Sequence, residues 1–192
     1  MKYGQNESVD AFWKAIDPGD HILQLYENEA EFMDMLERFV RDGFENNESV
    51  VVIATAQHLN ELKARFKKIE LADGLADGKF FPLDAAEALS RFMVNNWPDN
   101  RLFHKTITAI LGRATHGGHK VRAFGEMVAL LWAQGNTSAT IRVEDLWNNL
   151  KKVYRFPLFC AYPRGIFTEN ADESIKNVCA THSRMVPALA AC

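Results

Sequence analysis

The segment Ser49–Ala54, SVVVIA, places four consecutive β-branched residues in an almost unbroken apolar run. A strand with one face in water alternates apolar and polar residues, whereas a continuous apolar run is typical of a strand covered on both faces. Strands of this kind occur in parallel sheets whose connecting helices pack on the two sides. This segment therefore predicts an α/β fold for a chain that contains it.

Four further segments have the composition of strands, and each is followed by apolar residues at helical spacing. They are residues 21–26, 79–83, 120–124 and 157–162. Pro82 is unfavourable inside a central strand, so we expect it near a strand end or at an irregularity. The alternation predicts a three-layer sandwich with a mainly parallel central sheet of about five strands.

The length of 192 residues suits a single domain with one well-formed core. Residues 18–187 carry the alternating pattern, and we expect them to form this domain. Residues 1–17 are largely polar, with an apolar cluster of Phe12, Trp13 and Ile16, which predicts an extension with a short packing helix. Residues 188–192 are expected to be a C-terminal tail.

The net charge of −3, with no long basic run, argues against direct nucleic-acid binding. No apolar run approaches the roughly 18 residues of a membrane span, so no membrane contact is expected. The cysteines Cys160, Cys179 and Cys192 form no CxxC pair, which indicates free thiols in a reducing compartment. We therefore expect a cytoplasmic protein.

Ligand sites in open parallel sheets lie at the carboxyl ends of the strands. The aromatic and polar residues at these ends have the make-up of a small-molecule site, although each acid alone is more often a helix cap. We expect Trp147 to pack in the core and Trp132 to form a pocket wall. The candidate ligand-binding residues are Tyr26, Glu27, Thr55, Asp84, Glu126, Trp132, Tyr162 and Arg164.

Motifs for known chemistries are missing from the sequence. There is no GxxxxGK[ST] loop, and the turn after the first strand reads YENEAEF, whose acids would repel a triphosphate. There is also no GxSxG or HExxH. We expect Cys160 to be an inert core thiol, His21 to be structural, and His182 to be an interaction residue. No catalytic residue, metal site or cofactor is therefore predicted.

Two alternatives remain open at this point. The chain could be a degenerate nucleotide-binding protein that keeps an ATPase-like fold. It could instead be a hydrolase that holds a divalent metal ion with Glu27, Asp84 and Glu126.

Several motifs, in this order along residues 18–187, resemble the MEDS family, the methanogen/methylotroph sensory domain. They are DHILQLYENEAEF, SVVVIAT, the LDA at 83–85, FGEMVALLW with its following GN, EDLWNNL and FCAYP. The combination of FGEM, LLW, GN, LW and CAYP is specific.

The resemblance implies a non-catalytic sensory domain with a RecA/KaiC-like fold that lacks a working phosphate loop. It would make Asp84 a relic of a metal-binding strand and small hydrocarbon derivatives the ligands. Family members typically carry a kinase or DNA-binding domain, so the signal would pass here to a separately encoded kinase or regulator. A homodimer remains open.

Overall fold

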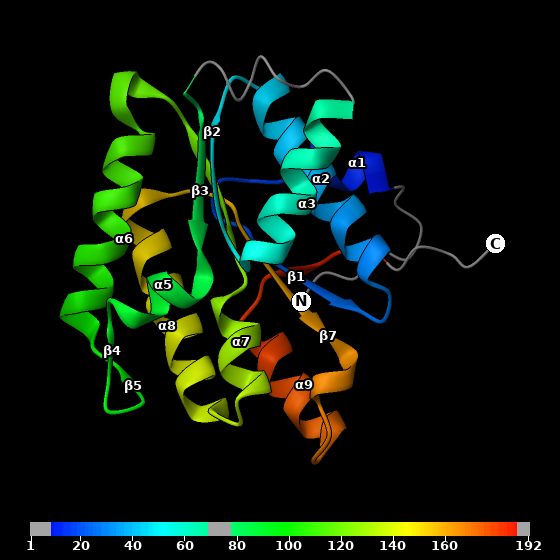
Figure 1. Cartoon of the computed structure of the whole chain (residues 1–192), viewed down its shortest axis with the longest axis vertical. Helices are drawn as coiled ribbons and strands as arrows, with labels where there is room; N and C mark the ends of the chain where they lie inside the picture. The colour runs from blue at the N-terminus through cyan, green and yellow to red at the C-terminus, as the bar shows by residue number, and fades with distance from the viewer. Residues whose placement is uncertain (1–8, 69–77, 188–192) are drawn as a thin grey trace.

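The computed structural model describes residues 9–68 and 78–187, and its centre is a parallel sheet of six strands in the order β3-β2-β6-β7-β1-β8 (Figure 1). Each neighbouring pair in this sheet runs parallel. The strands are β1 (His21–Tyr26), β2 (Ser49–Ala54), β3 (Phe80–Asp84), β6 (Val121–Gly125), β7 (Leu158–Pro163) and β8 (Arg184–Met185).

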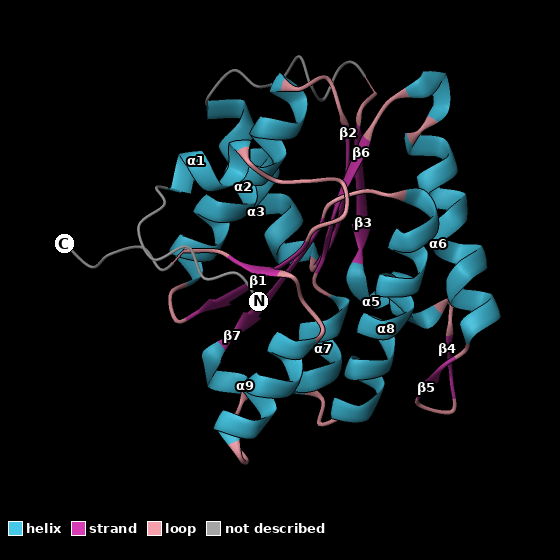
Figure 2. Ribbon diagram, turned by 180° about the vertical axis from the view of Figure 1, so that it is seen from behind, coloured by secondary structure: helices cyan, strands magenta, loops and turns pink. Residues whose placement is uncertain are grey.

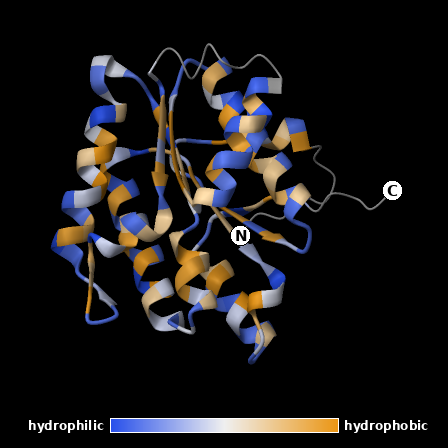
Figure 3. Cartoon of the chain, viewed as in Figure 1, coloured by the Kyte–Doolittle hydropathy of each residue, from blue (hydrophilic) through white to orange (hydrophobic). Residues whose placement is uncertain are grey.

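Helices cover both faces of the sheet, as the apolar run of β2 predicts (Figure 2). One face packs against α1 (Val9–Lys14), α2 (Glu29–Glu45) and α3 (Ala56–Lys68). The other packs against α5 (Ala85–Ser90), α6 (Asn100–Ala114), α7 (Met127–Ala133), α8 (Thr137–Tyr154) and α9 (Ala171–Ala180). Figure 3 shows the contrast between the apolar central strands and the mixed surfaces of the helices. The predicted three-layer α/β sandwich is confirmed.

All five predicted strands are present, and three of them begin and end one residue later than expected. The prediction missed β8, which follows α9 and pairs with Ile22 and Leu23 of β1. It also missed a small hairpin of β4 (Met93–Val94) and β5 (Trp97–Pro98). Strands this short carry too few residues to show an alternating pattern.

The expectation for Pro82 was wrong, since it occupies the middle position of β3. β3 lies at the outer edge of the sheet and, among the described strands, pairs with β2 alone. Lys79 O accepts a hydrogen bond from Val50 N, so alternate residues of β3 turn toward β2 and Pro82 turns outward. A proline on that side removes no ladder bond and leaves an edge that a further strand pairs with poorly.

The N-terminal helix α1 packs on the domain as expected, because Phe12 and Trp13 are both buried. Trp13 makes edge contacts with Phe39 of α2 and Phe159 of β7. Residues 1–8 of the expected extension, and the expected tail 188–192, lie outside the described residues. Among the described residues, no helix combines the length and the hydropathy needed to cross a bilayer.

Candidate functional site

The structure places Glu126 at the carboxyl end of β6, where it is 6% exposed. One carboxylate oxygen accepts a hydrogen bond from the backbone N–H of Thr55 at 2.8 Å. The Nδ1 atom of His58 lies 2.9 Å from the same oxygen. Glu126 stands at the N-cap position of α7, yet its side chain makes no capping bond to that helix. It therefore joins the ends of β2 and β6.

His58 lies between two carboxylates, because its Nε2 atom contacts Glu29 at the start of α2. Burial alone would lower the pKa of His58, but the hydrogen bonds and charges of Glu126 and Glu29 outweigh it and raise the pKa. Tyr26 lies nearby and stacks on Phe32. Burial, followed by the charges of Glu29 and Glu126, raises the pKa of the Tyr26 phenol, which stays protonated. Tyr26, Thr55 and Glu126 thus come together in one neighbourhood of the structure.

Glu27 and Arg164 form a second neighbourhood at the end of β1, where their charged groups approach to 3.9 Å on the surface. They line a cavity of about 420 Å³, here called the β1 hollow. It lies beside the part of β1 that β8 does not cover, since β8 pairs only with Ile22 and Leu23. Its lining residues are Gln24, Leu25, Glu27, Asn28, Glu31, Met35, Arg164, Val186 and Pro187.

Gln24 is the buried polar residue of the β1 hollow, with 7% exposure. Its Oε1 atom has no hydrogen-bond partner among the described residues. Buried amide groups are paired in most proteins, because an unmade hydrogen bond costs about 1–3 kcal/mol. An unpaired oxygen in the wall of a cavity is consistent with a partner that is not part of the chain.

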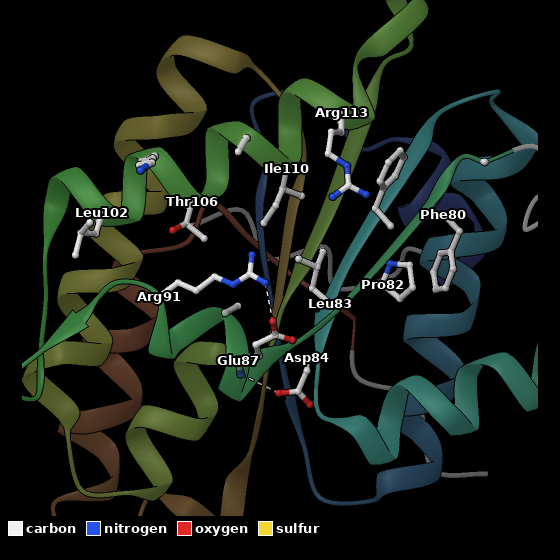
Figure 4. Close-up of a pocket in the computed structure, with 15 residues that line it drawn as sticks. Phe80, Pro82, Leu83, Asp84, Glu87, Arg91, Leu102, Thr106, Ile110 and Arg113 are labelled. Atoms are coloured by element: carbon white, nitrogen blue, oxygen red, sulfur yellow. Dashed lines mark hydrogen bonds and ion pairs between the residues drawn. The ribbon is translucent and has the colours of Figure 1, made fainter.

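Asp84 ends β3 opposite Ala54 of β2 and caps α5 by accepting a hydrogen bond from Glu87 N at 2.9 Å (Figure 4). It borders a surface groove of about 810 Å³ between β3 and α6, here called the β3 groove. Arg91 pairs with Glu87 at one side of the groove, and Arg113 lies over the Phe81 ring. Both arginines of the groove therefore contact other residues of its lining.

The remaining two predicted site residues lie in the core. Trp132 packs against Phe167, with ring centroids 4.9 Å apart. Tyr162 is fully buried and donates a hydrogen bond of 2.5 Å to Glu144 of α8. Successive residues of a strand point to opposite faces, so Tyr162 faces α8 although it stands at a strand end. Trp147 packs in the core as expected, edge-on against Phe103.

Glu144 belongs to a buried polar cluster with His21, Cys160 and His182. Burial lowers the pKa of each histidine to about 3, so both rings are neutral. Burial also raises the pKa of Glu144 and of the Cys160 thiol. The expectation of an interaction role for His182 on the surface was wrong, since its side chain is fully buried. His21 is hydrogen bonded, as expected.

The three acids proposed as a metal site for a hydrolase do not converge. Glu126 is held by Thr55 and His58, Glu27 pairs with Arg164, and Asp84 caps a helix. β1 and β3 are four strand spacings apart in the sheet, which corresponds to about 19 Å. Glu27 and Asp84 therefore lie too far apart to bind one ion.

Sequence reasoning missed His58, Glu29 and Glu144, which are the partners of the residues that it selected. All three lie on helices, where each looks like an ordinary surface position. Glu144 was detectable in principle, because it lies beside the apolar stripe formed by Val143 and Trp147 of α8.

Comparisons with known proteins agree with this architecture. A solved structure from Pyrococcus horikoshii OT3, described only as a structural study of a project target, aligns with a TM-score of 0.57. The alignment covers 95% of this chain and 89% of the other at 9% identity, and so supports the fold alone. No curated protein matches the sequence.

The family comparison covers most of the chain. Residues 20–183 match the model described as MEDS: MEthanogen/methylotroph, DcmR Sensory domain. This match spans every described strand of the central sheet except β8, whose two residues, 184 and 185, follow its end. The chain belongs to the MEDS family of sensory domains.

Proposed function

We propose that the protein is a sensory domain that binds a small organic molecule in the β1 hollow. The observation that carries the proposal is the buried Oε1 atom of Gln24, which lies in the wall of a cavity near the carboxyl end of β1 and has no hydrogen-bond partner within residues 9–68 and 78–187. The cavity volume of about 420 Å³ lies within the range of small-molecule sites. Its position agrees with where parallel sheets bind ligands.

The residues that line the β1 hollow indicate the chemistry of the ligand that would bind there. The Oε1 atom of Gln24 calls for a hydrogen-bond donor, such as a hydroxyl, amine or amide group. Leu25, Met35 and Val186 offer apolar contact to a short hydrocarbon body. A small hydrocarbon derivative with one polar group meets both requirements, in line with the ligands that the family resemblance implies.

A path for the signal starts at the turn between β1 and α2. Asn28 lines the β1 hollow and also caps α2, since its side chain accepts a hydrogen bond from Ala30 N at 2.8 Å. The next residue, Glu29, contacts His58, which in turn contacts Glu126. A ligand that shifts this turn would therefore change the contacts that join α2 to the ends of β2 and β6. The output would pass to a signalling kinase or regulator.

The alternative of a nucleotide ligand is less compatible with this turn. Glu27, Glu29 and Glu31 follow β1, where a phosphate loop would need backbone amides and a lysine. The Asn28 side chain already occupies one of the free amides at the start of α2. Calorimetric titration of the protein with ATP and magnesium measures its affinity for the nucleotide. Micromolar affinity would favour the nucleotide alternative.

Ligand-observed NMR with a panel of short alcohols, amines, amides and carboxylic acids tests the proposal. We expect saturation transfer from the protein to some of these compounds, and loss of the signal in Gln24→Met and Arg164→Ala. Arg113→Ala removes an equivalent charge from the β3 groove and is the matched control. The saturation-transfer signal should persist in this variant. Binding that survives Gln24→Met but disappears in Arg113→Ala would place the ligand in the β3 groove and contradict the proposal. The absence of binding by every compound would also contradict it.

A further inference from the structure

Four buried side chains from distant parts of the sequence converge on one point between the sheet and α8. His21 begins β1, Cys160 lies on β7, Glu144 lies on α8, and His182 follows α9. One nitrogen, sulfur or oxygen atom of each lies within 4.8 Å of those of the other three. Each of these residues could serve as a metal ligand.

The hydrogen bonds of the two imidazoles fix which nitrogen faces this point. The Nδ1 atom of His21 lies 3.1 Å from the carbonyl oxygen of Thr181, and Nδ1 of His182 lies 2.8 Å from that of Val178. A carbonyl oxygen only accepts, so each Nδ1 carries the proton and donates. The Nε2 atom of each ring is then left with a lone pair that points into the cluster. Metal-binding histidines are usually oriented in this way by a second hydrogen bond.

The Nε2 atom of His182 gives an independent indication of a missing partner. The side chain is fully buried, and Nε2 has no hydrogen-bond partner among the described residues. Nε2 lies 3.5 Å from a Glu144 oxygen that already accepts a hydrogen bond from Tyr162. Since buried polar atoms seldom remain unpaired, an acceptor lone pair at this position calls for a donor or a cation.

We propose that His21, Glu144, Cys160 and His182 bind a divalent transition-metal ion of the zinc class. Zinc bonds of about 2.0–2.3 Å place the corners of a tetrahedron about 3.3–3.8 Å apart. In the structure His21 Nε2 lies 3.3 Å from Glu144 Oε2 and 3.4 Å from Cys160 Sγ, and this Sγ lies 3.8 Å from the same Oε2. Tyr162 holds the other Glu144 oxygen and leaves Oε2 for the metal.

Charge balance supports the same assignment. Isolated charges are costly in a protein interior. A doubly charged cation is neutralised by one thiolate and one carboxylate, while the two imidazoles bind as neutral ligands. The mixture of one sulfur, two nitrogen and one oxygen ligands favours zinc over magnesium or calcium, which prefer oxygen alone.

Four protein ligands close the coordination sphere, so the ion holds the fold together and activates no water. It joins β1, β7, α8 and the segment that leads into β8. The site lies on the opposite face of β1 from Gln24, and it does not depend on the ligand proposed for the β1 hollow.

Metal analysis and cobalt substitution test the site on the full chain, purified without a metal-affinity tag. We expect about one bound zinc ion per chain, as for a closed structural site. Cobalt added to the metal-free protein should give the visible bands of a tetrahedral ion and a near-ultraviolet thiolate-to-cobalt band. Zinc should raise the melting temperature of the metal-free wild-type chain, a readout that needs no variant to fold.

Cys160→Ser should remove the thiolate-to-cobalt band, and Cys179→Ser, a half-buried cysteine outside the cluster, should keep it. Asn148→Leu removes a side chain whose Oδ1 atom lies 3.0 Å from Nδ1 of His21, and should weaken zinc binding about 10–100-fold. Metal-free protein that shows neither a cobalt spectrum nor a thermal shift with zinc would overturn the proposal. A thiolate band that survives in Cys160→Ser and disappears in Cys179→Ser would also overturn it.

Discussion

The Nδ1 atom of His58 lies 2.9 Å from both carboxylate oxygens of Glu126, although 68 residues separate the two in the sequence. The pair joins the first turn of α3 to the end of β6, and Glu29 adds α2 through the other ring nitrogen. The contacts that hold the ends of α2, α3 and β6 together therefore depend on the protonation of the His58 ring.

This dependence predicts how stability varies with pH. The pKa of His58 is raised in the folded protein, so the charged ring stabilises the fold fully below the ordinary value of 6.5. The stabilisation is lost as the pH rises through the raised pKa. Urea denaturation should therefore show that His58→Gln lowers the free energy of unfolding more at pH 6 than at pH 9.

His104→Gln is the matched control, because His104 is an exposed histidine on α6. We expect its effect on the free energy of unfolding to be small at both pH values. An equal loss of stability in His58→Gln at pH 6 and pH 9 would mean that the two carboxylates do not hold a proton on the ring.

Two helical glycines should respond to alanine in opposite directions. A Cβ atom on Gly43 of α2 would lie 2.6 Å from a methyl carbon of Val50 and 2.8 Å from Cδ of Arg122. This overpacking should cost about 1–3 kcal/mol and exceed the helix-propensity gain of about 1 kcal/mol. The midpoint of urea denaturation should fall for Gly43→Ala.

Apart from the adjoining residues and the backbone of α6 itself, no heavy atom of the described residues lies within 4 Å of the position of a Cβ added at Gly112 of α6. Gly112→Ala should therefore raise the free energy of unfolding by about 0.5–1 kcal/mol, as expected for a helical position without contacts. If Gly43→Ala stabilised the protein to the same extent, α2 would not lie as close to Val50 and Arg122 as the structure places it.

Arg122 holds two acids against the sheet, and its removal should be costly. The side chain is 2% exposed and pairs with Asp42 at 2.8 Å and Glu48 at 2.5 Å. It also donates to the carbonyl oxygen of Phe39 at 2.9 Å. Arg122→Met removes the cationic partner of both carboxylates and should lower the free energy of unfolding by about 3–5 kcal/mol.

Arg113→Met, at an exposed arginine of α6, is the matched control for Arg122→Met. We expect it to change the free energy of unfolding by less than about 0.5 kcal/mol, since exposed substitutions are usually mild. A small effect of Arg122→Met in the same denaturation experiment would mean that water replaces the ion pairs at little cost.

The fold was predictable because its signal is local. The apolar run of β2 indicates burial on both faces, and the turn residue Asn28 marks the start of α2. The order of strands depends instead on contacts between distant segments, and no single segment carries it. β1 therefore lies beside β7 and far from β3, which separates acids that looked equivalent in the sequence.

Only the local part of the site, the residues at strand ends, was predictable from the sequence. Position at a strand end selected Glu126 and Tyr26 correctly as neighbours, but it could not identify the helical partner His58. It also grouped Tyr26 with Tyr162, although β1 and β7 present these side chains to opposite faces of the sheet. Strand alternation predicts such a difference only when the register is known.

Gln24 provides a prediction that separates stability from binding. The free protein bears the cost of its unpaired buried Oε1 atom, so an apolar side chain of similar length should relieve it. Gln24→Met should keep or raise the free energy of unfolding, by up to about 1 kcal/mol, while it abolishes the thermal shift caused by a bound ligand. Loss of stability in the ligand-free variant would show that Oε1 is paired in solution, and the case for Gln24 as a ligand contact would then fail.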